Sequence, residues 1–171
     1  MDGRPKDRAG SLKLHKELKE LSRNANPAFS VGLVDSDNVF EWTITLFGPT
    51  ETYYEGGMFK AVMKFPANYP YEPPTLRFTS KVWHPNVYED GRVCISILHS
   101  PNEDPMGYED VSERWSPAQS VESILVSVIA MLSSPNDESP ANVDAAKMWR
   151  DDRAGYKRRV RRCVEQSMED L

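Results

Sequence analysis

Residues 84–117 read HPNVYEDGRVCISILHSPNEDPMGYEDVSERWSP and contain Cys94, one of only two cysteines in the chain. Cys94 stands between Val93 and Ile95, after a rigid His-Pro-Asn and before a run of carboxylates. A free cysteine in so apolar a setting is usually a buried and inert core residue. The rest of the sequence has to decide between that interpretation and a functional thiol.

Length and composition predict a single domain over residues 1–171. The chain has 39% hydrophobic and 10% aromatic residues, which is enough for one sizeable core. Its net charge of -5 argues against a general nucleic-acid or anionic-membrane binder, because such proteins carry an excess of Lys and Arg. No apolar run approaches the roughly 20 residues that span a bilayer, so we expect no direct membrane insertion.

Cysteine usage predicts a reducing compartment. Cys94 and Cys163 provide neither a disulfide framework nor a zinc-binding spacing, and no leader sequence is recognised at Met1. Cys163 adjoins the apolar side of a helical segment, where packing is its default role. We therefore expect a cytoplasmic protein.

Four stretches have apolar residues at the spacing of a helix. They cover residues 14–21, 121–132, 143–150 and 152–168. Ser120 precedes the second stretch, and its hydroxyl oxygen can cap the first turn. That second stretch is the most apolar, which indicates the central buried helix.

Four runs of alternating apolar residues predict strands. These runs cover residues 29–33, 40–46, 59–65 and 75–79. The turn-forming residues 35–38 make a hairpin of the first two runs, and short links favour an antiparallel meander. The segment around Cys94 then lies beyond the sheet.

A basic run, RRVRRC at residues 158–163, raises the alternative of nucleic-acid contact. No aromatic stacking residues are interleaved with the basic residues, and the chain as a whole is acidic. We interpret the run as a solvated helix face, with cations placed favourably toward a helix C-terminus.

The surroundings of Cys94 argue against two kinds of site. A metal site drawn from His84, Cys94, His99 and Cys163 would match no zinc spacing. A cysteine hydrolase would need a histidine base and an electropositive pocket. The following segment is instead rich in carboxylates, which disfavour a thiolate. These carboxylates are Glu103, Asp104, Glu109, Asp110 and Glu113.

Such acidity suits an incoming lysine amine that is drawn to a thioester already formed on Cys94. The cysteine would then be a carrier. A carrier thiol has to be exposed and rigidly placed, and the attack needs a donor for the oxyanion. Pro85 stiffens the neighbouring loop, and the Asn86 amide is a candidate donor.

Five motifs together resemble the ubiquitin-conjugating enzymes. They are GPTETYYEGGMF at 48–59, YPYEPP at 69–74, HPN at 84–86 with a cysteine eight residues after its asparagine, WSP at 115–117 and PN at 135–136. The resemblance runs nearly end to end. It implies an α+β fold with an N-terminal helix, a four-stranded antiparallel meander sheet, a central helix and two C-terminal helices.

The resemblance also implies an acyltransferase reaction. Cys94 takes ubiquitin from the activating enzyme as a thioester, in an ATP-dependent pathway, and passes it to a lysine without a metal or organic cofactor. By the same resemblance Asn86 is the oxyanion donor or a loop stabiliser, and His84 is mainly structural.

Ser139 falls at the gate position beside the cysteine, where many members of the family carry Asp. A serine does not desolvate or orient a lysine as a carboxylate does. On this interpretation Asp137, Glu138 or the acidic insertion compensates.

The chain also carries an insertion over residues 100–114, like one subgroup of the family. That subgroup includes the cell-cycle conjugating enzyme and the enzyme of endoplasmic-reticulum-associated degradation, and VCISILH at 93–99 makes the latter the closer match. Members build polyubiquitin chains that target proteins to the proteasome, and the insertion is associated with chain building. The alternative is a tolerated solvated loop.

The resemblance implies ubiquitin, the activating enzyme and a RING-type ligase as partners. A partner would recruit the protein to the surface of the endoplasmic reticulum. Lys13 and Lys16 match positions that contact the activating enzyme or the ligase, although plain solvated lysines are an equal alternative. The residues implied in ligase contact are Tyr71, Ser116, Pro117 and Ala118.

Two rival functions belong to other classes. The first is a non-catalytic module of the same fold that binds ubiquitin or a ligase, but such variants lack the cysteine that stands here at Cys94. The second is a thiol hydrolase, for which the sequence does not evidently place a base next to Cys94.

Overall fold

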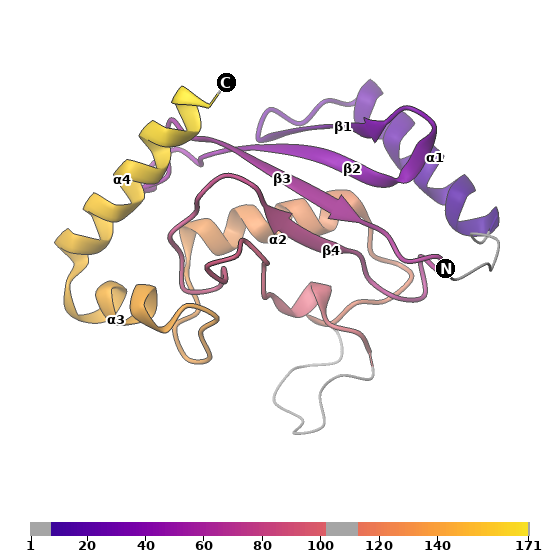
Figure 1. The fold of residues 1–171 in the computed structure, drawn as a ribbon. Helices are drawn as coiled ribbons and strands as arrows, with labels where there is room; N and C mark the ends of the chain where they lie inside the picture. The colour runs from indigo at the N-terminus through magenta and orange to yellow at the C-terminus, as the bar shows by residue number, and fades with distance from the viewer. Residues whose placement is uncertain (1–7, 102–112, 171) are drawn as a thin grey trace.

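The computed structural model describes residues 8–101 and 113–170. Within these residues one α-helix precedes four strands, and a short 3₁₀ turn and three α-helices follow them (Figure 1). The elements are α1 (Arg8–Arg23), β1 (Phe29–Asp35), β2 (Asn38–Phe47), β3 (Met58–Lys64), β4 (Thr75–Phe78), the short 3₁₀ turn η1 (Ser96–Leu98), α2 (Val121–Ser133), α3 (Val143–Asp151) and α4 (Arg153–Glu169).

The four strands form one antiparallel sheet in the order β1-β2-β3-β4, which confirms the predicted meander. Ile44 of β2 pairs with Val31 on one side and Ala61 on the other. Trp42, Ile44 and Leu46 alternate along β2 and are buried, because successive side chains of a strand point to opposite faces. One face of the sheet therefore carries the core.

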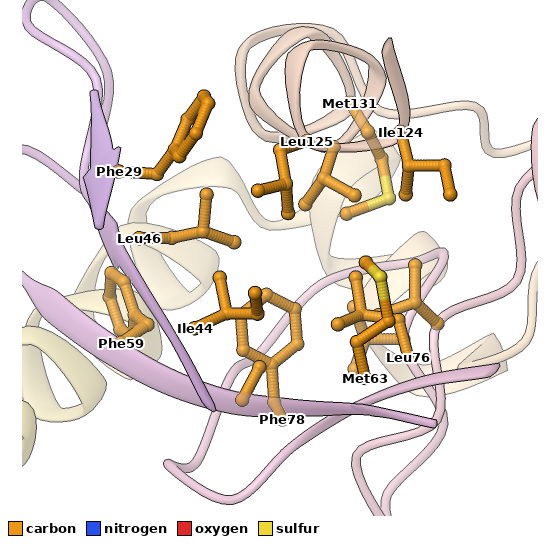
Figure 2. Close-up of a cluster of buried hydrophobic side chains, with 14 of the residues drawn as sticks. Phe29, Ile44, Leu46, Phe59, Met63, Leu76, Phe78, Ile124, Leu125 and Met131 are labelled. Atoms are coloured by element: carbon orange, nitrogen blue, oxygen red, sulfur yellow. The ribbon is translucent and has the colours of Figure 1, made fainter. Parts of the chain in front are cut away.

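Helix α2 lies across that face. Figure 2 shows Ile124, Leu125 and Met131 of α2 facing the side chains of the sheet, including Leu46 and Met63. This apolar helix is the predicted central one. Helices α1 and α4 lie at opposite ends of the sheet (Figure 1).

The start of α2 is fixed as the sequence indicated. The Ser120 hydroxyl oxygen accepts a hydrogen bond from Ser123 N at 3.2 Å, and the Ser123 hydroxyl oxygen accepts one from Ser120 N at 2.8 Å. Two backbone donors that the helix cannot satisfy internally are thus paired. The helix ends at Ser133, before Pro135.

Two buried tyrosines join α4 to the segment that leads into residues 84–86. The Tyr54 hydroxyl donates to Trp83 O at 2.6 Å and lies 2.6 Å from the Tyr156 hydroxyl of α4. Because the Tyr54 hydroxyl donates its proton to Trp83 O, the Tyr156 hydroxyl is the donor in the hydrogen bond between the two tyrosines. Burial raises the pKa of Tyr156 to about 12, so both phenols stay neutral.

The turn before Cys94 depends on one glycine. Gly91 has a φ of +96°, and its backbone oxygen accepts a hydrogen bond from Phe78 N at 2.8 Å. A side chain at this position would collide with the Phe78 carbonyl, and few other residues tolerate such a φ. Gly91 thereby ties the cysteine segment to the end of β4.

Candidate active site at Cys94

His84 anchors the loop on which the site is built. It is completely buried, and its Nδ1 accepts a hydrogen bond from Asn86 N at 2.9 Å. This bond assigns the proton to Nε2, which donates to Met131 O of α2 at 2.8 Å. Burial lowers the pKa of His84 to about 4, so the ring is neutral at physiological pH. These contacts fit the structural role that the resemblance implied for His84.

Asn86 connects this loop to the segment after α2. Its Nδ2 donates to Asn136 O at 2.8 Å, and its Oδ1 accepts from Asn136 N at 3.0 Å. Its backbone oxygen accepts from Cys94 N at 2.9 Å, which fixes the cysteine backbone. The two side-chain bonds tie the loop of Asn86 to the segment after α2, and the role of oxyanion donor stays a prediction.

Cys94 itself is half-buried and lines a hollow of about 400 Å³. The thiol therefore borders open space and is not sealed in the core. Ser139 is exposed and lines the same hollow, so the structure brings it near the cysteine. Asn86 and Asn136 contribute to the wall between them.

A histidine also lies beside the cysteine. The Sγ atom of Cys94 is 3.7 Å from Nε2 of His99. From the sequence, His99 is predicted only as a candidate metal ligand, and no base is predicted next to Cys94. The signal it lacked was the 3₁₀ turn Ser96–Leu98, which turns the chain back so that residue 99 lies near residue 94.

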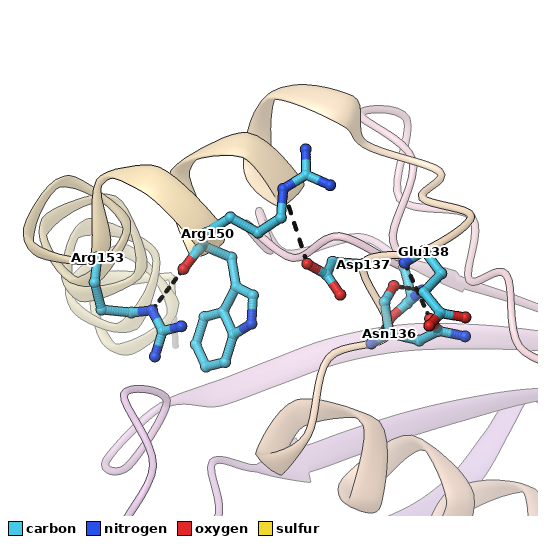
Figure 3. A network of polar contacts seen from close by, with 7 residues as sticks. Asn136, Asp137, Glu138, Arg150 and Arg153 are labelled. Atoms are coloured by element: carbon cyan, nitrogen blue, oxygen red, sulfur yellow. Dashed lines mark hydrogen bonds and ion pairs between the residues drawn. The ribbon is translucent and has the colours of Figure 1, made fainter.

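The two acidic residues before Ser139 point elsewhere. Figure 3 shows Asp137 directed toward Arg150 of α3, and their Oδ2 and Nε atoms are 3.9 Å apart. Glu138 is exposed, and its backbone nitrogen donates to Asn136 Oδ1 at 3.1 Å. Neither carboxylate lines the hollow around Cys94.

The acidic insertion falls largely outside the described residues. Glu103, Asp104, Glu109 and Asp110 all belong to the part that the structure does not describe. Glu113 is described and exposed. Its neighbour Arg114 is buried and donates from Nη1 to Pro101 O at 2.9 Å, which joins the two sides of the insertion.

The residues implied in ligase contact come together on a second surface. Lys13 of α1 donates from Nζ to Pro117 O at 3.2 Å and to Gln119 O at 3.0 Å. Lys13 is half-buried, whereas Lys16, one turn along α1, is exposed. Lys13 thus holds the loop of residues 116–119 against α1.

A buried tryptophan and a glutamate complete this surface. Trp115 donates from Nε1 to Pro70 O at 2.8 Å, which joins the loop of residues 69–74 to the loop of residues 115–119. Glu17 of α1 accepts from the Tyr69 hydroxyl at 2.7 Å and from Val121 N at 2.8 Å.

The side chains implied in ligase contact differ in exposure. Tyr71 is 61% exposed, Pro117 and Ala118 are exposed, and Ser116 is half-buried. The contacts of Lys13, Trp115 and Glu17 bring these side chains together.

Neither a metal cluster nor a membrane span is found in the described ranges. Over residues 8–101 and 113–170, no three His, Cys, Asp or Glu side chains are grouped to hold a metal ion. Over the same residues, each helix is too short or too polar to cross a bilayer.

Comparison with known proteins gives one consistent result. The family model described as ubiquitin-conjugating enzyme matches residues 13–164. Ubiquitin-conjugating enzyme E2 7 of Arabidopsis thaliana is 62% identical over 93% of this chain and 96% of its own length. Ubiquitin-conjugating enzyme E2 15 of Schizosaccharomyces pombe is 56% identical over 91% and 93%. Ubiquitin-conjugating enzyme E2 G2 of Homo sapiens is 52% identical over 91% and 94%.

Proposed function

The chain belongs to the family of ubiquitin-conjugating enzymes, and on this premise we propose that Cys94 carries ubiquitin as a thioester and passes it to a lysine. The single observation that carries the proposal is the placement of the thiol. Cys94 lies half-buried on the wall of a 400 Å³ hollow, with its backbone nitrogen bonded to Asn86 O at 2.9 Å. A carrier needs both the access and the fixed position.

The reaction has two steps. In the first, the Cys94 thiolate attacks the thioester that joins ubiquitin to the activating enzyme, and the thiol of that enzyme leaves. In the second, a lysine amine of a substrate or of another ubiquitin attacks the new thioester, and Cys94 leaves. Each attack places negative charge on the carbonyl oxygen, which a preorganised donor stabilises.

Asn86 is the candidate for that donor as well as for the loop stabiliser. One hydrogen of its Nδ2 is used on Asn136 O, and the other is available for the oxyanion. His84 acts as a positioning residue, because its ring is neutral and bonded on both sides. Ser139 lines the same hollow, and its hydroxyl offers the incoming lysine a hydrogen bond but no charge.

The ligase in this proposal is of the RING type. It binds where α1 meets the loops of residues 69–74 and 115–119. Tyr71 is the aromatic anchor, since an exposed tyrosine among rigid prolines suits a binding hot spot. Pro117 and Ala118 border it, and Lys13 holds their loop in place. Lys16 contributes an exposed charge to the same face.

The product we propose is a degradative polyubiquitin chain. The carboxylates Glu103, Asp104, Glu109 and Asp110, together with Glu113, would attract the lysine of an acceptor ubiquitin. We also propose that the protein works as one catalytic domain over residues 1–171, since its core cluster runs from Leu14 to Val160. We place it in the cytoplasm, with a partner that recruits it to the endoplasmic reticulum.

The test is to incubate the protein with activating enzyme, ATP and ubiquitin, and to run gels with and without a thiol reductant. The proposal expects an adduct that the reductant removes. In Cys94→Ser the adduct becomes an oxygen ester, which a reductant does not cleave.

Two outcomes would favour the rival functions. No adduct under conditions that charge a control enzyme would favour a non-catalytic module that binds ubiquitin or a ligase. Turnover of a ubiquitin thioester to free ubiquitin, without any transfer to amines, would favour a thiol hydrolase. The histidine beside Cys94 makes this second outcome a necessary measurement.

A further inference from the structure

Among the described residues that line the hollow at Cys94, one is a base. The described lining consists of apolar, serine and asparagine side chains apart from Cys94 and His99. Among these described residues, only the imidazole has a side-chain nitrogen that accepts a proton. The thiol and the imidazole are adjacent, with 3.7 Å between Sγ of Cys94 and Nε2 of His99.

The backbone of His99 is held from two sides. Its nitrogen donates to Ser96 O at 2.9 Å across the 3₁₀ turn, and its oxygen accepts from Trp115 N at 3.1 Å. Trp115 is buried, so this second bond joins His99 to a fixed part of the molecule. These bonds fix the backbone of His99 on both sides of the insertion, and the half-buried imidazole lies beside the sulfur.

The transfer step requires a base. A lysine carries an ammonium at neutral pH, because its unperturbed pKa is about 10.4. Its nitrogen has no lone pair until a proton leaves. The Ser139 hydroxyl is a poor proton acceptor, and the carboxylate of Asp137 is directed toward Arg150.

We infer that Nε2 of His99 accepts the proton of the lysine that attacks the thioester on Cys94. The inference rests on the proposed function. The carbonyl carbon under attack is one bond from Sγ, so an amine that approaches this carbon comes within reach of a nitrogen 3.7 Å from the same sulfur. His99 is thus a catalytic residue of the second step.

The bonds and protons of this step balance without any further reagent. The ammonium gives one proton to Nε2 of His99, and the freed lone pair forms the C–N bond. The C–S bond breaks, and its electron pair stays on Sγ. The second proton leaves the nitrogen and ends on Sγ as the thiol forms, while His99 releases the first proton to solvent. The products are an amide, a thiol and one proton.

The experiment compares two amines on the preformed thioester. His99→Gln keeps a polar side chain of similar reach but does not accept a proton. Ubiquitin is first loaded onto Cys94 of the wild type and of the variant, and the activating enzyme is then inhibited. Discharge, the loss of the ubiquitin thioester, is followed with free lysine or with hydroxylamine. Hydroxylamine is already uncharged at neutral pH and has a lone pair to attack with.

We expect His99→Gln to slow discharge to lysine by at least about tenfold, and discharge to hydroxylamine by less than about twofold. Equal slowing with both amines would mean a structural role for His99 and would overturn the inference. Unchanged discharge to lysine would overturn it as well. His15→Gln, an exposed histidine of α1, is the matched control.

Failure of the proposed function would look different. If the wild type itself forms no reducible adduct, the carrier role of Cys94 is wrong. If both proteins form the adduct but discharge at the same rate to lysine, only the role of His99 is wrong. A variant that folds poorly would slow both amines, so the ratio of the two rates remains informative.

Discussion

The side-chain amide of Asn86 and the backbone of Asn136 exchange two hydrogen bonds, of 2.8 and 3.0 Å. They join residues 50 positions apart, one in the loop before Cys94 and one after α2. The segment that carries Ser139 is held near the cysteine by this pair. Asn86 therefore links the position of the thiol to the position of Ser139.

Removal of this link should destabilise the protein. Asn86→Ala loses both bonds to the backbone of Asn136, so we expect the free energy of unfolding to fall by about 1–3 kcal/mol, at about 0.5–1.5 kcal/mol for each bond. Urea unfolding at neutral pH measures the change. Asn68→Ala, at an exposed position, is the control. Equal stability of Asn86→Ala and the wild type would contradict the linking role.

Acid should unfold the protein in part through His84. The pKa of this ring is about 4 when folded, against about 6.5 when unfolded, because burial disfavours the charge. Between these values the unfolded chain binds the extra proton, so stability is fully present above about pH 6.5 and is lost as the pH falls toward 4. The loss amounts to about 3 kcal/mol.

This pH dependence is measured by urea unfolding at several pH values between 4 and 7. We expect His84→Gln to be less stable at neutral pH and to show a flatter profile than the wild type below pH 6.5. His15→Gln should keep the profile of the wild type, since His15 is exposed. A His84→Gln profile as steep as that of the wild type would mean that other groups cause the acid sensitivity.

The two lysines of α1 should behave differently. Lys13→Met removes the hydrogen bonds to Pro117 O and Gln119 O, so we expect a loss of about 1 kcal/mol in stability. Lys16→Met changes an exposed side chain and should stay within about 0.5 kcal/mol of the wild type. Thermal unfolding of the pair tests this, and identical melting temperatures would argue that Lys13 is only a solvated lysine.

The acidic residues should matter for chain extension more than for charging. Replacing Glu103, Asp104, Glu109 and Asp110 by their amides removes the attraction for an incoming lysine, while the thiol and its loop are unchanged. We expect the rate of charging to stay within about twofold and the rate of diubiquitin formation to fall about tenfold or more. Gel-based single-turnover rates separate the two steps.

The same neutralisation at Glu165 and Glu169 of α4 is the matched control for that experiment, since both are exposed. It should leave both rates unchanged. If the four substitutions slow charging as much as extension, the acidic segment does not serve the acceptor in particular.

Local patterns were sufficient to predict most of the fold. The alternation in residues 40–46 and the short links between strands depend on neighbours in sequence, and the meander confirms them. The cap at Ser120 is a local signal as well, and its hydrogen bonds confirm it. These elements could be predicted because burial of one face determines the spacing of apolar residues along the chain, and capping determines the residue type just before a helix.

Parts of the site depended on contacts that no local pattern encodes. Lys13 reaches Pro117 across 104 positions of sequence, which α1 and the later loop bring together only in the fold. His99 lies beside Cys94 because a 3₁₀ turn too short to leave a periodic signal folds the chain back. Asp137 is drawn to Arg150 of α3, so its nearness in sequence to Ser139 did not place it in the hollow.

The central claim concerns which sulfur holds ubiquitin, and the chain offers a direct comparison between its two cysteines. Intact mass is measured after reaction with activating enzyme, ATP and ubiquitin, for the variants Cys94→Ala and Cys163→Ala. The account predicts that Cys163→Ala gains the mass of one ubiquitin and loses it on reduction, while Cys94→Ala gains nothing. A reducible ubiquitin adduct on Cys94→Ala, or none on Cys163→Ala, would contradict it.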